Sequence, residues 1–166
     1  MRSLVTGELF RALPEAGIAT LRFNFRGVEG SEGVHGGGVE EHHDIVAAID
    51  RLTSSTPASP IVLAGWSFGA DVSASVIDDR LAGWYLIAPP LRVLPARDFV
   101  VGDDPRPKHL AVPEHDMFRP PDGAREATAG WANTTVEVIA GADHFLVGRT
   151  SKVAASLVAF VRELGR

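Results

Sequence analysis

The most informative segment of the sequence is Pro60-Ile61-Val62-Leu63-Ala64-Gly65-Trp66-Ser67-Phe68-Gly69-Ala70. It joins a short apolar run to the pattern Gly-x-Ser-x-Gly and continues into a segment of helical character. Small residues at Gly65 and Gly69 allow a sharp turn between a strand and a helix, so that the Ser67 hydroxyl stands clear of the sheet. The pattern therefore nominates Ser67 as a nucleophile.

Strand-like and helical segments alternate on both sides of this stretch. Strands are expected at residues 19–25, 60–64, 83–88, 108–112 and 135–140. Helices are expected at residues 4–16, 39–52, 67–78, 123–131 and 150–164. The strands are mostly continuous apolar runs, which is typical of a sheet covered on both faces. The sequence predicts a single α/β domain over residues 1–166, with a mostly parallel sheet of about five strands and helices on both faces.

The composition limits the classes of partner. Of the 166 residues, 45% are hydrophobic and 22% are charged, and the net charge of -5 offers no basic surface for nucleic acid. The absence of cysteine excludes disulfides, thiolate metal sites and cysteine nucleophiles. The apolar runs are too short to span a bilayer, and no basic flank followed by an apolar stretch opens the chain. We expect a cytoplasmic protein that acts on a small molecule and binds neither nucleic acid nor membrane.

Two further reactive side chains follow predicted strands. Asp116 comes after the strand at 108–112, and His144 comes after the strand at 135–140. Because the carboxyl ends of parallel strands meet at one edge of a sheet, both should lie near Ser67. A histidine can accept the serine proton while a carboxylate holds the imidazole in its working tautomer. The order Ser, Asp, His predicts a catalytic site.

Other aspartates compete for the role of the acid. Asp103 and Asp104 follow the third predicted strand, and Asp143 directly precedes His144. Adjacent residues rarely let a carboxylate face its neighbour's ring, so Asp143 is interpreted as a turn residue. Asp116 is preferred because it follows the strand end that is closest in the chain to the histidine.

The remaining histidines and glycines do not predict a metal or cofactor site. His35, His42 and His43 lack the spacing of His-Glu-x-x-His, and no metal or organic cofactor is expected. The glycines in residues 27–33 lack the pattern of a P-loop or a dinucleotide site. This segment is interpreted as a tight turn beside the active site.

Four segments together carry a family resemblance. They are residues 21–33, Leu63-Ala64-Gly65-Trp66-Ser67-Phe68-Gly69-Ala70, residues 112–121, and Gly141-Ala142-Asp143-His144-Phe145-Leu146. They are similar to the α/β-hydrolase superfamily, and within it to the small lidless hydrolases close to dienelactone hydrolase and the serine aminopeptidase-like group. The resemblance implies Ser67 as nucleophile, Asp116 as acid and His144 as base. It also implies cleavage of a small ester, lactone or thioester through an acyl-serine, with a peptide or amide as the second choice.

The amino terminus departs from the resembled pattern. The Phe68 backbone N–H is one expected oxyanion donor. The family draws a second donor from a loop before the first helix, whereas this sequence opens at Met1 on residues that already have helical character. The family also has a strand between those matching 19–25 and 60–64. We expect an amino-terminal truncation, with these two strands either pairing directly or leaving an empty slot; the alternative function is a non-catalytic binding protein or an inactive fragment.

The expected pocket is shallow and open. Residues 89–107 form too short a connection for a large lid. The side chains that flank the nominated catalytic residues are candidates for its lining, with core packing as the competing interpretation for the aromatic ones: Trp66, Phe68, Met117 and Phe118.

Overall fold

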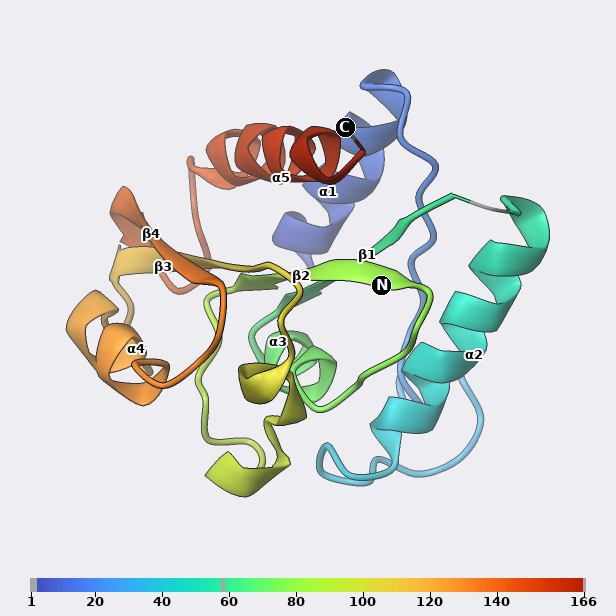
Figure 1. The fold of residues 1–166 in the computed structure, drawn as a ribbon, viewed down its shortest axis with the longest axis horizontal. Coiled ribbons are helices and arrows are strands. Elements are labelled where there is room, and N and C mark those ends of the chain that lie inside the picture. The colour runs from blue at the N-terminus through green and yellow to red at the C-terminus, as the bar shows by residue number, and fades with distance from the viewer. Residues whose placement is uncertain (1–2, 58, 166) are drawn as a thin grey trace.

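A computed structural model describes residues 3–57 and 59–165, and within these ranges it contains four strands and five α-helices (Figure 1). The strands are β1 Ile61–Trp66, β2 Leu81–Ile87, β3 Lys108–His115 and β4 Thr134–Asp143. The helices are α1 Leu4–Glu15, α2 Glu41–Ser55, α3 Phe68–Ser73, α4 Pro121–Ala127 and α5 Thr150–Leu164. The strands form one parallel sheet in the order β1-β2-β3-β4. The predicted α/β class is confirmed.

The two faces of the sheet are covered by different helices. α1 and α5 pack together on one face, and α2, α3 and α4 lie on the other (Figure 1). Side chains of β2 alternate between the two cores: Trp84 and Leu86 join the core under α2 and α3, while Tyr85 and Ile87 join the core under α1 and α5. All four are fully buried. This explains why β2 is a continuous apolar run in the sequence.

The predicted strand at 19–25 is wrong. Residues 18–25 have no regular secondary structure, and no described strand pairs with the outer edge of β1. A groove separates the two segments, with Leu21 and Phe23 on one side and Leu63 on the other. Alternating apolar residues favour an extended chain, but a strand also needs a hydrogen-bonded neighbour. Of the two expected arrangements, the structure has the empty slot rather than direct pairing.

Helix α3 is shorter than the predicted helix at 67–78. It ends at Ser73, whose hydroxyl donates to the Gly69 carbonyl at 2.7 Å, and the Ala74 carbonyl accepts the Val101 N–H at 3.3 Å. The chain therefore bonds to a distant loop where the helix would continue.

Among the described helices, none combines the length and apolar character needed to cross a membrane.

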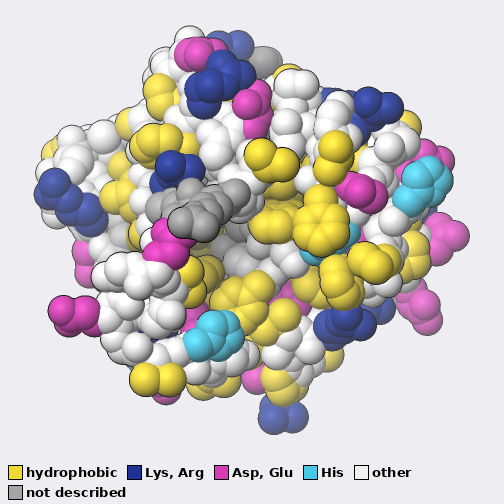
Figure 2. All heavy atoms as spheres, turned by 180° about the vertical axis from the view of Figure 1, so that it is seen from behind, with side chains coloured by type: hydrophobic (Ala, Val, Ile, Leu, Met, Phe, Trp, Pro, Cys, Tyr) yellow, Lys and Arg dark blue, Asp and Glu magenta, His cyan; other side chains and the backbone are white. Residues whose placement is uncertain are grey.

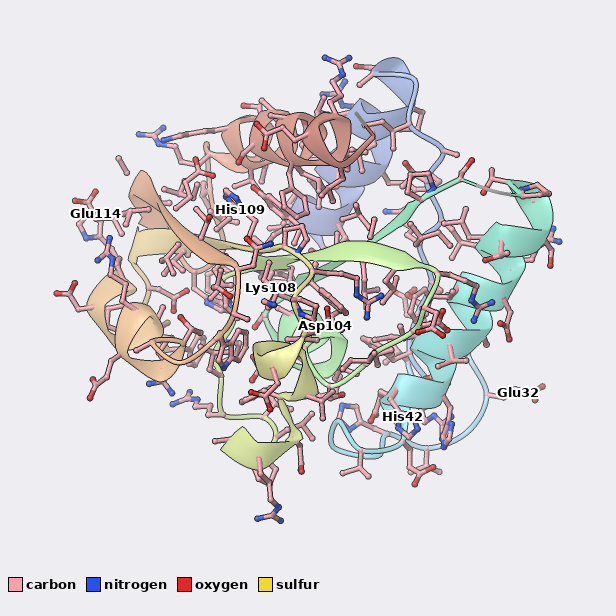
Figure 3. All side chains as sticks on the ribbon, viewed as in Figure 1. Glu32, His42, Asp104, Lys108, His109 and Glu114 are labelled. Carbon is pink, nitrogen blue, oxygen red and sulfur yellow. The ribbon has the colours of Figure 1, made fainter. Side chains whose placement is uncertain are left out.

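Asp104 lies where β3 begins, at the opposite end of that strand from Asp116. Its carboxylate accepts hydrogen bonds from the Arg106 backbone N–H at 2.9 Å and from the Arg106 Nη2 at 2.6 Å. Its backbone carbonyl accepts a hydrogen bond from the neighbouring Lys108 ammonium (Figure 3). The bonds from Arg106 lower the pKa of Asp104 to about 2. Asp103 and Asp104 both precede β3, so neither is placed to serve as the acid beside Ser67.

Asp104→Asn should lower the free energy of unfolding at neutral pH by about 1 kcal/mol. The folded pKa of Asp104 lies below its ordinary value of 3.8, so its stabilisation is present above that value and lost as the pH falls towards about 2. Urea unfolding at pH 7 and at about pH 2.5 should show the difference from the parent shrinking in acid. Asp103→Asn, at an exposed neighbour, is the matched control. An Asp104→Asn difference that does not change with pH would contradict the assignment.

Candidate active site

Ser67 sits in a turn of unusual backbone geometry between β1 and α3. Its φ of 53° lies in the left-handed region, which residues other than glycine rarely adopt. The Ser67 N–H donates to the Ile87 carbonyl at 2.9 Å, which ties the turn to the end of β2. Such strain persists only where the surroundings enforce it, and it concentrates at functional sites. We name residues 65–69 the elbow.

Gly65 makes the elbow possible. A Cβ added to Gly65 would lie 2.3 Å from the Gly69 carbonyl oxygen, a distance that no side chain tolerates. A Cβ added to Gly69 would meet only the Phe25 ring, at an ordinary 3.7 Å. The close approach of the strand to the helix therefore requires glycine at the first position and not at the second.

His144 and Asp116 converge on Ser67 from the ends of β4 and β3. The His144 Nε2 lies 2.8 Å from the Ser67 Oγ, and the His144 Nδ1 lies 2.9 Å from the Asp116 Oδ2. The imidazole and the carboxylate are almost completely buried. With the proton on Nδ1, the imidazole donates to the carboxylate and accepts from the serine hydroxyl, so one tautomer satisfies all three groups. The three residues nominated from the sequence are thus joined by two hydrogen bonds.

The second carboxylate oxygen of Asp116 is held by its own loop. The Asp116 Oδ1 accepts the Phe118 N–H at 2.8 Å and the Arg119 N–H at 3.1 Å. Asp143 faces elsewhere: its carboxylate accepts the Phe145 N–H at 3.1 Å and is a turn cap, as interpreted from the sequence. Asp116 therefore directs one oxygen to the imidazole, and the other fixes the orientation of the carboxylate.

Three of the candidate pocket side chains, Trp66, Met117 and Phe118, lie in different surroundings. Phe118 packs edge-on against the His144 ring at a centroid distance of 4.5 Å. The Trp66 indole N–H donates to the His144 carbonyl at 3.2 Å, and its ring lies 5.7 Å from the imidazole. Met117 is 74% exposed. Trp66 and Phe118 thus pack around the imidazole, whereas Met117 points towards solvent.

A groove of about 430 Å³ opens beside Ser67. Its lining includes Trp66 and Phe68 from the elbow and Phe23 and Phe25 from the extended segment before α2. Met117 and Phe118 are not part of this lining. The molecule seen from behind is hollowed among hydrophobic side chains (Figure 2). Sequence reasoning missed Phe23 and Phe25 because it assigned them to a strand; the alternating aromatics were the available signal.

Phe68, the residue expected from the sequence to donate to an oxyanion, directly follows Ser67. It is the first residue of α3, and the first N–H groups of a helix have no acceptor within the helix. Its ring is held between Phe25, at a centroid distance of 5.6 Å, and His35, at 5.0 Å. The Phe68 N–H therefore belongs to the residue directly after Ser67, and the side chain of that residue is packed in place.

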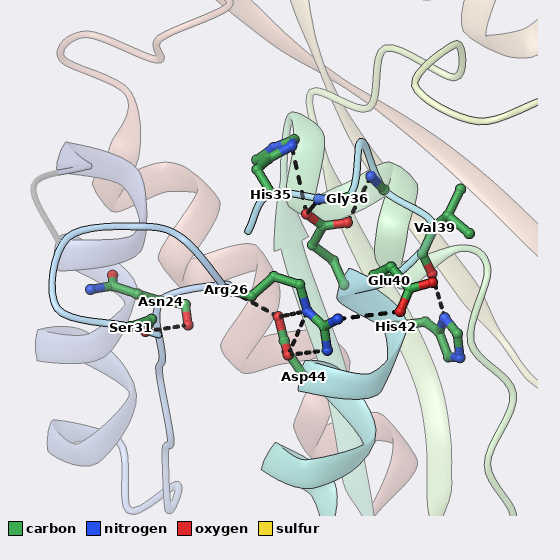
Figure 4. Close-up of polar contacts among 11 residues, drawn as sticks. Asn24, Arg26, Ser31, His35, Gly36, Val39, Glu40, His42 and Asp44 are labelled. Atoms are coloured by element: carbon green, nitrogen blue, oxygen red, sulfur yellow. Dashed lines mark hydrogen bonds and ion pairs between the residues drawn. The ribbon is translucent and has the colours of Figure 1, made fainter. Parts of the chain in front are cut away.

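The glycine-rich loop, residues 26–38, is anchored on α2 (Figure 4). The Glu41 carboxylate is buried and accepts the Gly36 N–H at 2.7 Å and the Gly38 N–H at 2.8 Å. Burial acts to raise the pKa of Glu41, but these two N–H groups, the Glu41 backbone N–H and the nearby His35 together hold the pKa below its ordinary value. At the other end of the loop, Arg26 pairs with Asp44 at 3.0 Å. The loop presents His35 to Phe68 and thus borders the elbow.

The histidines of α2 lie outside the site. The rings of His42 and His43 lie 3.7 Å apart, tilted to each other by 42°, in the first turn of α2, where one side chain is half-buried and the other exposed. Across residues 3–57 and 59–165, no three His, Asp or Glu side chains converge in a way that could hold a metal ion.

Comparison with known proteins identifies the fold family. No family model matches the chain. The structure of an α/β serine hydrolase homologue from Coxiella burnetii is 31% identical and superposes with a TM-score of 0.84, covering 96% of this chain and 76% of that one. The chain belongs to the α/β-hydrolase superfamily. A lidless α/β serine hydrolase from Xanthomonas campestris is 26% identical over 98% of this chain and 74% of its own, with a TM-score of 0.82.

The chain is also similar to a protein whose function is not described. An uncharacterised protein of Rickettsia prowazekii (strain Madrid E) is 29% identical over 162 residues, which cover 92% of this chain and 68% of that protein. The structural neighbours are hydrolase-like, in line with the elbow between β1 and α3.

Proposed function

We propose that the chain is a serine hydrolase that cleaves a small ester, lactone or thioester through an acyl intermediate on Ser67. The observation that carries the proposal is the pair of hydrogen bonds, 2.8 and 2.9 Å long, that runs from the Ser67 Oγ through His144 to Asp116. This arrangement matches the geometry by which a serine hydroxyl is activated in acyl transfer. The hydrolase-like neighbours support the same class of reaction.

The geometry supports one proposed role for each residue. The Ser67 Oγ attacks the substrate carbonyl while the His144 Nε2 accepts its proton, and the Asp116 carboxylate stabilises the resulting imidazolium. The Phe68 N–H donates to the oxyanion that forms on the carbonyl. His144 then gives the proton to the leaving group. Water then attacks the acyl-serine with His144 again as the base, the bond between the acyl group and the Ser67 Oγ breaks to release the acid, and His144 returns the proton to the Oγ. The proposed reaction uses no cofactor.

The groove beside Ser67 favours a compact, largely apolar substrate. Its walls include the rings of Phe23, Phe25 and Trp66, which provide contact area without charge. Arg22 and Asn24 add polar groups at the same lining. An ester or thioester with a short or medium acyl chain suits these walls, and a peptide or amide is the second choice.

A fluorophosphonate probe and a panel of p-nitrophenyl esters test this proposal. The probe should attach to Ser67, as mapped by mass spectrometry of the labelled peptide, and short and medium acyl esters should be cleaved. Labelling should be absent in urea, because only the folded chain brings the imidazole to the hydroxyl. A chain that is folded by circular dichroism but neither labels nor cleaves any ester would overturn the proposal in favour of a non-catalytic binding protein.

A further inference from the structure

Asp71 is a fully buried carboxylate outside the group formed by Ser67, His144 and Asp116. It lies on α3, the helix that starts directly after Ser67. Its Oδ1 accepts the Leu91 N–H at 2.8 Å, and its Oδ2 accepts the Arg92 and Val93 N–H groups, each at 2.9 Å. Burial raises the pKa of Asp71, although the three N–H groups oppose that effect. The Asp71 carboxylate therefore holds the loop after β2 through three hydrogen bonds.

The loop that Asp71 holds has an unfavourable backbone. Ala88 has a φ of 45° and Leu91 a φ of 51°, both in the left-handed region and both at residues with a Cβ. Such conformations are strained and persist only where other contacts enforce them. The three hydrogen bonds to Asp71 supply that enforcement at Leu91.

Arg119, which lies in the same loop as Asp116, also bonds to the loop after β2. Its Nε donates to the Pro90 carbonyl at 3.0 Å and its Nη2 donates to the Leu91 carbonyl at 3.3 Å. Leu91 thus gives its N–H to Asp71 and its carbonyl to Arg119. The Arg119 backbone N–H donates in turn to the Asp116 Oδ1.

The loop also reaches the imidazole through an aromatic contact. The Arg92 guanidinium lies over the Phe118 ring at 4.9 Å, and the Phe118 ring packs edge-on against His144 at 4.5 Å. A cation over an aromatic face is attracted by the ring quadrupole, which favours this placement of Phe118. Two neighbours of the His144 ring, the Asp116 carboxylate and the Phe118 ring, are therefore connected to the loop that Asp71 holds.

We propose that Asp71, residues 90–93 and Arg119 form a positioning bridge that sets the Asp116 carboxylate and the Phe118 ring against His144. The bridge connects α3, which follows Ser67, to the loop that carries Asp116. The distance between α3 and this loop is therefore not set by the sheet alone. Asp71 and Arg119 are positioning residues, since their side chains act through the loop and through Asp116. The inference rests on the proposed hydrolase function for its kinetic consequence and on the contacts alone for its structural one.

Arg119→Gln, Asp71→Asn and the double variant test the bridge by the rate of fluorophosphonate labelling. Each single change should slow labelling by about tenfold or more, because displacing a catalytic group by about 1 Å can cost about 100-fold. In ester hydrolysis the loss should fall on kcat and leave KM nearly unchanged. The double variant should be no slower than the slower single variant, because both residues act through the same loop and the first change already removes the positioning. Arg125→Gln, which removes an exposed pair with Asp122 on α4, is the matched control and should label like the parent.

A spectroscopic readout separates positioning from general stability. The ring Cε1–H resonance of His144, assigned by its loss in His144→Gln, should shift in Arg119→Gln and stay in place in Arg125→Gln. Arg119→Lys, which can restore one of the two hydrogen bonds to the loop, should give an intermediate shift.

Two failures can be told apart. Folded bridge variants that keep the parental labelling rate and the parental His144 resonance would overturn the bridge, and so would a double variant whose loss is the product of the single losses. A parent that does not label would overturn the proposed function, while the His144 resonance would still decide whether the bridge positions the ring.

Discussion

Ser67→Ala should abolish fluorophosphonate labelling and lower ester cleavage by about a million-fold, the scale at which loss of a serine nucleophile acts in a well-studied protease. The Ser67 Oγ, 2.8 Å from the His144 Nε2, is the atom that would bond to the acyl group. Labelling is measured by gel fluorescence and cleavage by release of p-nitrophenol. The free energy of unfolding should change little, because Gly65 and the Ser67 backbone, rather than the hydroxyl, shape the elbow.

Ser75→Ala is the matched control for that change. Ser75 follows α3 in the chain, and its hydroxyl donates to the Val72 carbonyl at 2.8 Å, away from His144. This variant should label and cleave like the parent. Labelling that survives in Ser67→Ala would mean that another residue is the nucleophile and would contradict the proposed mechanism.

Asp116→Asn should lower kcat by about 10,000-fold, as expected when the imidazole is left in the wrong tautomer. The Asp116 Oδ2 accepts from the His144 Nδ1 at 2.9 Å in a buried environment. An amide can turn its NH2 towards Nδ1, which leaves the proton on Nε2 and removes the acceptor for the serine hydroxyl. Initial rates with a p-nitrophenyl ester give kcat and KM, and circular dichroism reports whether the variant is folded.

Asp143→Asn tests the competing acid. Asp143 adjoins His144 in sequence, but its carboxylate caps the turn at Phe145 and is exposed. Its replacement should leave kcat within a small factor of the parental value. A large loss in Asp143→Asn together with a small one in Asp116→Asn would reverse the assignment of the acid.

Local pattern was sufficient for most elements because their signals lie within single segments. α5 has the predicted bounds, since Val153, Leu157 and Phe160 recur at helical spacing and bury one face. Each of the four strands overlaps an apolar run that predicts a strand, and their bounds differ from the predicted ones by at most three residues. Ser67, Asp116 and His144 could be nominated together because parallel strands deliver their following loops to one edge of the sheet.

Pairing between distant segments could not be predicted in the same way. Residues 18–25 have the alternating pattern of a strand, yet they lie across a groove from β1 and are not part of the sheet. A ladder depends on what lies next to the segment, and that neighbour is not encoded in the segment itself. The same reason explains why the sequence does not predict Phe23 and Phe25 as walls of the groove beside Ser67.

Residue order alone is enough to predict the α/β class, the elbow and the three side chains nominated for chemistry, because strand, turn and helix signals are local and the sheet orders its loops. Three features emerge only from the folded chain: Gly65 rather than Gly69 is sterically required, no described strand pairs with the outer edge of β1, and Asp71 and Arg119 both bond to Leu91. These features arise from contacts between residues far apart in the chain. Their energies depend on distance and burial, which residue order alone does not specify.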